Sequence, residues 1–248
     1  MAMARRLLLH TLRRPARRAW LAAGLGLMAA PLMAEITSAR YTEETSRYAH
    51  GVLGDAIEYG TLELTFSGGK RLAITLPQSR VFEDIAPRLM DMDGDGAPEV
   101  IVVESSQTGG ARLAIYDETG LRAATPHIGQ RNRWLAPIIA ADLDGDGHIE
   151  VAYIDRPHLA KTLRVWRFQD NKLTQVASQA GLTNHRIGED FISSGIRDCG
   201  DGPEMITVNA NWSEVMATGF DGKTLSVRAL GPFKNQTSLK RALDCKAP

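Results

Sequence analysis

Two acidic segments of this 248-residue chain carry side chains whose types and spacing suit the binding of a hard cation. Residues 91–99 read DMDGDGAPE, and residues 142–150, which begin 51 positions later, read DLDGDGHIE. Each segment has aspartate at its first, third and fifth positions, glycine at its sixth and glutamate at its ninth. With a backbone carbonyl at the seventh position, these carboxylates can supply the six or seven oxygens, roughly, that Ca²⁺ prefers. The predicted ligands are Asp91, Asp93, Asp95, Glu99, Asp142, Asp144, Asp146 and Glu150.

The residues that follow distinguish these segments from a helix-flanked calcium hand. The twelfth position, where such a hand places a bidentate acid, is Val102 in the first segment and Tyr153 in the second. Both segments lead instead into short apolar runs, which predict buried strands. Magnesium fits less well, because it usually keeps several of its waters. The alternative interpretation is a pair of metal-free acidic turns, whose close carboxylates would repel one another without compensation.

The two segments resemble the FG-GAP and VCBS repeats, a family that includes the propeller of integrin α subunits and many exported bacterial proteins. In that family the acidic loop binds calcium between two strands of a blade, so the resemblance implies two structural calcium ions here. The resemblance extends over roughly residues 80–230. One feature departs from the family pattern, because the ninth position is commonly aspartate there and is Glu99 or Glu150 in this chain. The chain is also too short for a ring of the integrin size.

The distance between the two segments predicts the architecture. A period of about 50 residues with several short strands favours a propeller blade over a helical solenoid unit. Residues 81–125 and 136–177 each predict an inner strand, the acidic loop, a buried strand and two further strands, and residues 186–229 are a third, degenerate copy. The hairpin over residues 61–76 is the end of a partial first unit. We expect an all-β fold, a small β-propeller of about four blades over residues 51–232, with three full repeats plus a partial first one.

The two ends of the predicted propeller leave the closure of its ring open. Residues 35–50 are a polar segment before it, and residues 233–248 are a tail after it. Closure matters because an open stack of strands leaves sheet edges that invite association. The N-terminal segment or the tail could close the ring, or a second copy of the chain could complete an open arc.

The two cysteines of the chain predict a disulfide bond between the third repeat and the tail. Cys199 lies in the third copy of the acidic loop and Cys245 lies near the C-terminus. In an oxidising compartment a single pair is most simply a disulfide, and free thiols are the alternative. The third loop has lost the ligand spacing, because Asp198 and Asp201 are three positions apart where the intact loops have four. We therefore expect no tightly bound metal there.

Residues 1–34 have the three parts of a secretory signal peptide. They contain six arginines and no acid, then an apolar run over residues 19–33, then the small residue Ala34 near which we expect cleavage. The run is too short for a membrane span, which needs about 20 apolar residues, so we expect no stable membrane insertion. Without these six arginines the chain keeps 23 of its 29 basic residues and all 29 acidic residues, so its net charge is negative. A negative net charge argues against nucleic acid as a partner. The predicted location is the periplasm or the extracellular medium.

Several polar residues precede or begin the inner strand of a predicted unit. In a propeller such residues could gather at one mouth of the central channel, where acids could transfer protons or bind a second cation. The alternative is that they are loop acids that bind neighbouring backbone amides. The residues of this possible channel-mouth site are His50, Asp55, Glu83, Asp84, Trp134, His185 and Asp190.

These features predict an exported, calcium-stabilised β-propeller that acts as a binding or scaffold module for a protein or glycan partner. Two calcium ions would have a structural role, and catalysis is not required. The alternative is a hydrolase or lyase on a carbohydrate, which would use Glu83, Asp84 and Asp190 with His50 or His185. A lectin without chemistry is a third hypothesis. Glycan binding without turnover would favour the lectin, and loss of turnover after acid-to-amide changes would favour the enzyme.

Overall fold

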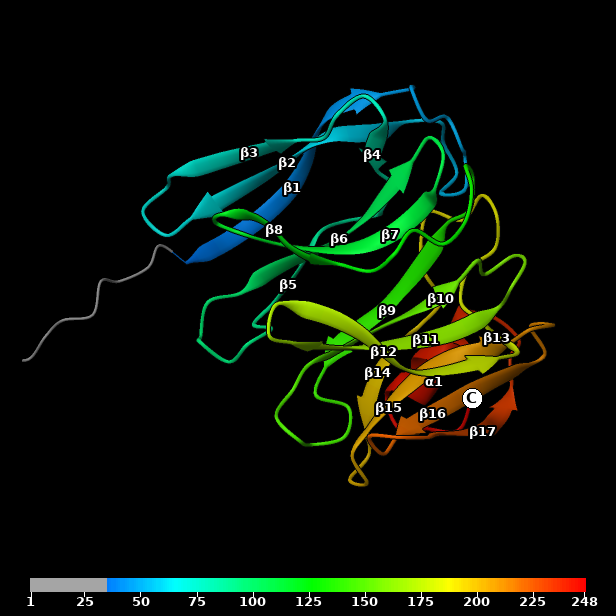
Figure 1. Ribbon diagram of the computed structural model, residues 1–248. Helices are drawn as coiled ribbons and strands as arrows, with labels where there is room; N and C mark the ends of the chain where they lie inside the picture. Colours follow the sequence, from blue (N-terminus) through cyan, green and yellow to red (C-terminus); the bar gives the residue numbers. More distant parts are fainter. Residues whose placement is uncertain (1–34) are drawn as a thin grey trace, which may run out of the picture. The chain divides into compact units, whose positions relative to one another are not determined.

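The computed structural model describes residues 35–248, so the predicted signal peptide and its cleavage near Ala34 lie outside the described residues. In the described part, the chain forms 17 strands and one short helix (Figure 1), which confirms the all-β prediction. The strands make three sheets that follow one another along the chain, and the paired strands are antiparallel. No helix in this part of the chain has the length and apolar character needed to span a bilayer.

The first sheet joins the partial first unit to the first full repeat. Its strand order is β1-β2-β4-β6-β7-β8, with β3 beside β2 and β5 beside β6. The pair of Tyr59 with Phe82 connects β2 to β4, so the partial unit is hydrogen-bonded to the repeat that follows it. The strands are β1 (Ile36–Thr45), β2 (Glu58–Phe66), β3 (Arg71–Thr75), β4 (Arg80–Phe82), β5 (Arg88–Met90), β6 (Glu99–Ser106), β7 (Gly110–Asp117) and β8 (Gly120–Ala124).

Strand β1 arises from the polar N-terminal segment, residues 35–50. It lies at the edge of the first sheet, with β2 as its neighbour, and of its ten residues only Ile36 is fully buried. An edge strand of this kind leaves most side chains in water. It therefore lacks the alternation of apolar and polar residues by which a half-buried strand is recognised.

The second and third full repeats each form a sheet of their own (Figure 1), as the repeat pattern predicts for propeller blades. The second sheet has the order β12-β11-β10-β9, and the third has the order β13-β15-β16-β17 with β14 also beside β15. The strands of the second sheet are β9 (Leu135–Ala141), β10 (Glu150–Asp155), β11 (Thr162–Gln169) and β12 (Lys172–Ala180). Those of the third are β13 (Leu182–Thr183), β14 (Gly195–Asp198), β15 (Pro203–Asn209), β16 (Glu214–Phe220) and β17 (Leu225–Pro232).

The strand that follows each intact acidic loop is buried along its whole length. All eight residues of β6 and all six residues of β10 are buried. On one face of β6, Val100 and Val102 pack with buried apolar residues of the partial first unit. On the other face, Ile101 and Val103 pack with buried apolar residues of the second repeat. A strand covered on both faces reads as a continuous apolar run, which is the pattern that marked these strands in the sequence.

The inner strand is interrupted at corresponding places in the three full repeats. In the first repeat β4 and β5 lie along the same edge of β6, and residues 83–87 separate them. In the second, β9 has a bulge opposite Ala152 and Tyr153. In the third, β13 and β14 lie along the same edge of β15, and residues 184–194 separate them. Glu83 and His185 lie in these interruptions, between the two segments of an inner strand.

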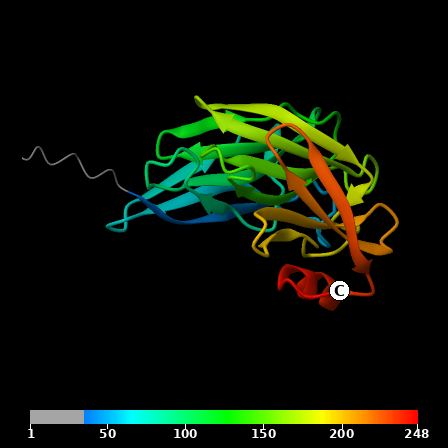
Figure 2. The ribbon, with the colours of Figure 1, turned by 90° about the horizontal axis from the view of Figure 1, so that it is seen from below.

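The tail contains a helix that covers the third sheet. Helix α1 (Gln236–Leu243) begins after Asn235, whose side chain accepts a hydrogen bond from the amide of Thr237. Leu239 and Ala242 are buried in a cluster with apolar residues of β15 and β16. Figure 2 shows the helix, in red, beside the last strands of the chain.

Candidate functional site

The two acidic loops fold in the same way, held by bonds from backbone amides to their own carboxylates. In the first loop the Asp91 carboxylate accepts from the amides of Gly94, at 2.8 Å, and Gly96, at 3.0 Å. In the second loop Asp142 accepts from the amides at the corresponding positions, 145 and 147, at 2.7 and 2.9 Å. Gly94 and Gly96 have φ of 79° and 90°, in the left-handed region that favours glycine. The acid at position one therefore shapes the loop as well as offering oxygen.

The carboxylates of each loop converge closely enough to share a cation. Ligand oxygens of Asp91, Asp93 and Glu99 lie within 4.8 Å of one another, and so do those of Asp142, Asp144 and Asp146. Oxygens that bind one Ca²⁺ at about 2.3–2.6 Å can be no farther apart than about twice that distance, so both groups are compatible with it. The donors are oxygens alone, as calcium prefers. Asp95 and Glu150 lie outside these two groups, although both belong to the predicted ligand sets.

An arginine binds the acids of each loop, which the sequence analysis missed. Arg167 of β11 contacts three carboxylates of the second loop, with nitrogens 2.5 Å from Asp144, 2.7 Å from Asp146 and 2.6 Å from Glu150. Arg122 of β8 contacts Asp93, at 2.5 Å, and also Glu99. A guanidinium in each loop thus offsets part of the negative charge that a metal would otherwise neutralise.

The glutamate at position nine is the most buried acid of each loop. Burial raises the pKa of Glu99 and of Glu150, against the effect of the backbone amides of Met92 and Leu143, which donate to them. A raised pKa means that the negative charge is costly at this place. A nearby cation, whether guanidinium or metal, would lower this cost.

Replacing Arg167 with glutamine should raise the calcium affinity of the second loop about tenfold or more, because calcium would no longer displace a guanidinium. The same change should lower the melting temperature in chelator, since Asp144, Asp146 and Glu150 would lose their shared counter-charge. Calorimetric titration with calcium and thermal melts in chelator measure the two effects. Arg164→Gln is the matched control, because Arg164 of the same strand binds Asp155 instead of the loop. Equal calcium affinity in wild type and Arg167→Gln would contradict this account.

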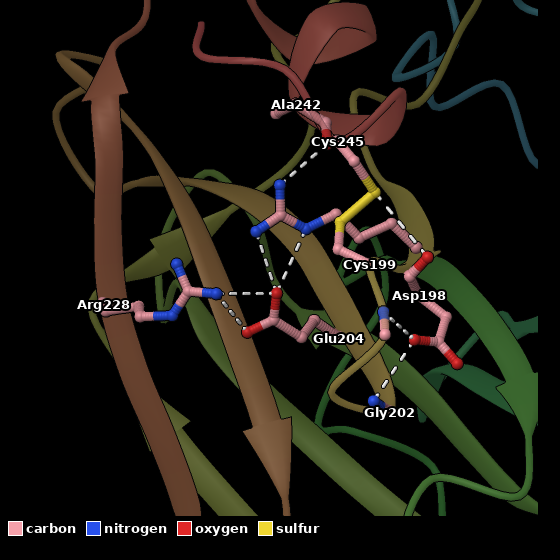
Figure 3. The surroundings of a disulfide bond; sticks show 9 residues. Asp198, Cys199, Gly202, Glu204, Arg228, Ala242 and Cys245 are labelled. Atoms are coloured by element: carbon pink, nitrogen blue, oxygen red, sulfur yellow. Dashed lines mark hydrogen bonds and ion pairs between the residues drawn. A yellow bond between two sulfur atoms is a disulfide. The ribbon is translucent and has the colours of Figure 1, made fainter.

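The third, degenerate loop is stabilised by covalent and ionic contacts (Figure 3). The predicted disulfide is present between Cys199 and Cys245, and Asp198 accepts hydrogen bonds from the amides of residues 200 and 202. Glu204, which corresponds to Glu99 and Glu150, binds Arg197 at 2.8 Å and Arg228 at 2.7 Å. Arg197 also donates to the carbonyl oxygen of Ala242 in α1, at 2.9 Å. The glutamate at this position therefore binds arginine in all three full repeats.

Of the seven residues predicted at the channel mouth, four come together. The His50 Nδ1 lies 2.5 Å from Oε1 of Glu83, whose side chain is fully buried, and the other Glu83 oxygen accepts from Ser105. The Trp134 indole N–H donates to the backbone oxygen of Glu83 at 2.9 Å. The Trp134 and His185 ring centroids are 4.9 Å apart. Burial raises the pKa of Glu83, and the bond to His50 acts against that shift.

The other three predicted residues lie elsewhere. Asp84 binds Arg88, at 2.6 Å, and accepts from the hydroxyl of Tyr41, at 3.3 Å. Asp55 is exposed and accepts from the amide of Ile57 at 2.8 Å, and Asp190 is exposed. The acids available for proton transfer near His50 therefore do not include these three.

Two histidines next to this group form a pair. His158 Nε2 lies 3.0 Å from His185 Nδ1, and His185 Nε2 lies 2.9 Å from the backbone oxygen of Glu189. Because that oxygen only accepts, His185 carries its proton on Nε2 and His158 donates to it, which leaves His158 Nδ1 without a proton. Burial, and next the neighbouring His185, lower the pKa of His158 to about 4, and burial lowers the pKa of His185. Both rings are therefore neutral at neutral pH.

His50, Trp134 and His158 border a pocket of about 360 Å³, here called the histidine pocket. On its rim, Leu159 and Ile187 are 61% and 72% exposed. The amide of Gly188 donates to the oxygen of Val52 at 3.0 Å, so loops of the first and last units meet beside it. The pocket thus takes residues from loops of several units, and the lining residues are His50, Asn132, Arg133, Trp134, Arg156, His158, Leu159 and Ile187.

Comparison with known proteins identifies the region of the acidic loops. The model of the FG-GAP-like repeat matches residues 91–153, a stretch that begins at the first residue of the first loop and ends in β10. The search of curated proteins gave no match. Among solved structures, the chain is similar to the crystal structure of rhamnogalacturonan lyase YesW, with 15% identity and a TM-score of 0.36 over 80% of this chain. It covers 52% of that structure, about half its length. The chain therefore contains an FG-GAP-like repeat, which includes both intact acidic loops.

Proposed function

We propose that the protein is an exported, calcium-stabilised binding module that docks a protein partner at the histidine pocket. One observation carries this proposal: loops of several units meet around one pocket, and two aliphatic side chains on its rim, Leu159 and Ile187, are mostly exposed. Large apolar side chains on an open pocket rim are typical of a binding site. The periplasm or the extracellular medium is the proposed location, which the disulfide between Cys199 and Cys245 supports.

Calcium would have a structural role in this proposal. The residues that would hold it are Asp91, Asp93 and Glu99 in the first loop and Asp142, Asp144 and Asp146 in the second. The ion would supply positive charge to close carboxylates. It would thereby fix the connection between the inner strand and the buried strand in two of the three full repeats.

The pocket supports a protein partner better than a glycan. Sugar-binding sites often offer an open aromatic face, but Trp134 is only 2% exposed, and its ring packs on His185. Trp212 lies outside the pocket lining, and the guanidinium of Arg186 covers it with a carbon 4.1 Å from the ring centroid. Aliphatic side chains such as Leu159 and Ile187 suit a protein surface.

The pair of His50 and Glu83 is the observation that favours the alternative function, an enzyme. A buried carboxylate, Glu83, orients His50 at the edge of a pocket that Arg133 and Arg156 also line. A carboxylate that orients a histidine is a common arrangement for a general base. A carbohydrate hydrolase or lyase would therefore lose its turnover in His50→Gln and Glu83→Gln while it kept its folded structure.

The double change Leu159→Asp and Ile187→Asp tests the proposed function. Peptides selected from a displayed random library on the wild-type protein should lose about tenfold or more of their affinity, because charge replaces the apolar rim. Fluorescence polarisation measures the affinity, and a glycan array measured in parallel should stay negative. Leu121→Asp is the matched control, since Leu121 is 48% exposed on β8 and does not line the pocket. Unchanged peptide affinity in the double variant, or selective glycan binding, would count against a protein partner.

A further inference from the structure

We propose that the histidine pocket recognises a carboxylate next to an aliphatic side chain, so that the partner docks through an acidic, apolar peptide segment. This inference rests on the proposed function, because it names the chemistry of the protein segment that the pocket takes.

The ionisable side chains that line the histidine pocket are basic. Its positive charges are those of Arg133 and Arg156, since His158 is neutral at neutral pH, and no aspartate or glutamate is among its eight lining residues. Low-dielectric walls around groups of one sign focus the field of those charges on a ligand. A ligand with a negative group is therefore favoured over a neutral or a positive one.

Arg133 is the group best placed to bind the anion. Arg156 already binds the buried Asp155, with Nε 2.7 Å from Oδ1. Arg133 is half-buried and, within residues 35–248, takes part in no ion pair. A guanidinium in this state offers paired N–H donors that match the geometry of a carboxylate.

Two acids close to the pocket, Glu83 and Glu189, are already engaged by other side chains. Glu83 is buried and bound to His50, and Glu189 faces Arg186 with 4.0 Å between Oε1 and Nη1. Because Glu83 holds Nδ1 of His50, that nitrogen is not free for a ligand. Arg133 is therefore the donor that the pocket offers to the carboxylate.

The size of the pocket and the side chains on its rim favour a short peptide segment over a larger protein surface as the ligand. A volume of about 360 Å³ suits a few side chains of one segment. Leu159 and Ile187, 61% and 72% exposed, can cover an aliphatic side chain of that segment and lose their contact with water. The matching segment has an aspartate or a glutamate beside leucine, isoleucine, valine or phenylalanine.

The test selects peptides from a displayed random library on the wild-type protein and measures their affinity, as synthetic peptides, for charge variants. We expect enriched peptides with an acid beside an aliphatic or aromatic residue. Arg133→Glu should weaken their binding by about tenfold or more, and replacing the peptide's acid with its amide should have a similar effect on the wild type. Arg133→Gln gives the loss without a reversed charge. Lys70→Glu is the matched control. Lys70 is exposed in the turn after β2 and does not line the pocket.

The possible results separate this inference from the proposed function. Enrichment of basic or uncharged peptides, or equal affinity in wild type and Arg133→Glu, would overturn the inference. Peptides that bind and depend on Leu159 and Ile187 but not on Arg133 would leave the proposed function standing and reject the carboxylate. If no peptide is enriched, both the proposed function and this inference fail.

Discussion

Calcium should raise the melting temperature of the protein by about 10 °C over its value in chelator. Loops of extracellular modules bind calcium with dissociation constants of about 0.1–1 mM, so about 10 mM calcium would add roughly 1.4–2.7 kcal/mol for each filled site. Two sites would then add about 3–5 kcal/mol, and each kcal/mol shifts the melting temperature of a chain of this size by about 2–4 °C. Thermal unfolding followed by circular dichroism in calcium and in chelator measures the shift.

Loop variants identify the source of this stabilisation. Asp93→Ala combined with Asp144→Ala should remove most of the calcium-dependent shift, because each change deletes an acid from one of the two groups. Asp201→Ala is the control with an equal charge change per site, since Asp201 is exposed in the degenerate third loop. Magnesium at the same concentration should stabilise less. Equal melting temperatures in calcium and in chelator would show that the loops are metal-free turns.

Replacing both cysteines by serine should lower the free energy of unfolding by about 4 kcal/mol, the value that the chain-entropy model gives for a closed loop of this length. The disulfide joins residues 46 positions apart and fixes the end of α1 to the third loop. A loss of this size corresponds to a fall of about 10 °C in melting temperature. Chemical denaturation of Cys199→Ser/Cys245→Ser and of the wild type gives the difference.

Non-covalent contacts of the tail provide the control for the disulfide. Arg197 binds the carbonyl of Ala242, and Leu239 is buried on the third sheet, so part of the docking of α1 does not need the bond. Leu239→Ala in the disulfide-bonded protein removes apolar packing and keeps the covalent link. If the serine variant unfolds at the wild-type denaturant concentration, these contacts alone hold the tail, and the disulfide adds no stability.

The repeats were the part of the fold that the sequence predicted best. Their acidic loops have a fixed spacing, and each intact loop is followed by an apolar run, residues 100–103 and 151–154, so local pattern alone marks them. The polar edge strand β1 and helix α1 were missed because each buries only a few residues, Ile36 in the one and mainly Leu239 and Ala242 in the other. Neither burial pattern leaves a clear period in the sequence.

The candidate site was predicted in part, for a reason that Glu83 and Asp84 illustrate. Successive residues at the end of a strand point to opposite sides, so Glu83 turns to His50 and Asp84 turns to Tyr41 and Arg88. The arginine contacts of the acidic loops depend on the register between strands, since Arg167 lies opposite Glu150 across the ladder. Register of this kind cannot be read from one segment of sequence.

Hydrogen–deuterium exchange with a selected peptide bound shows where on the protein the peptide docks. We expect slower exchange in the loops that supply or adjoin the pocket, residues 47–57, 130–134, 156–160 and 184–190, with no change in the acidic loops at constant calcium. Protection confined to residues 91–99 and 142–150, or to the outer strands β8, β12 and β17, would place the partner elsewhere and rule out docking at the histidine pocket.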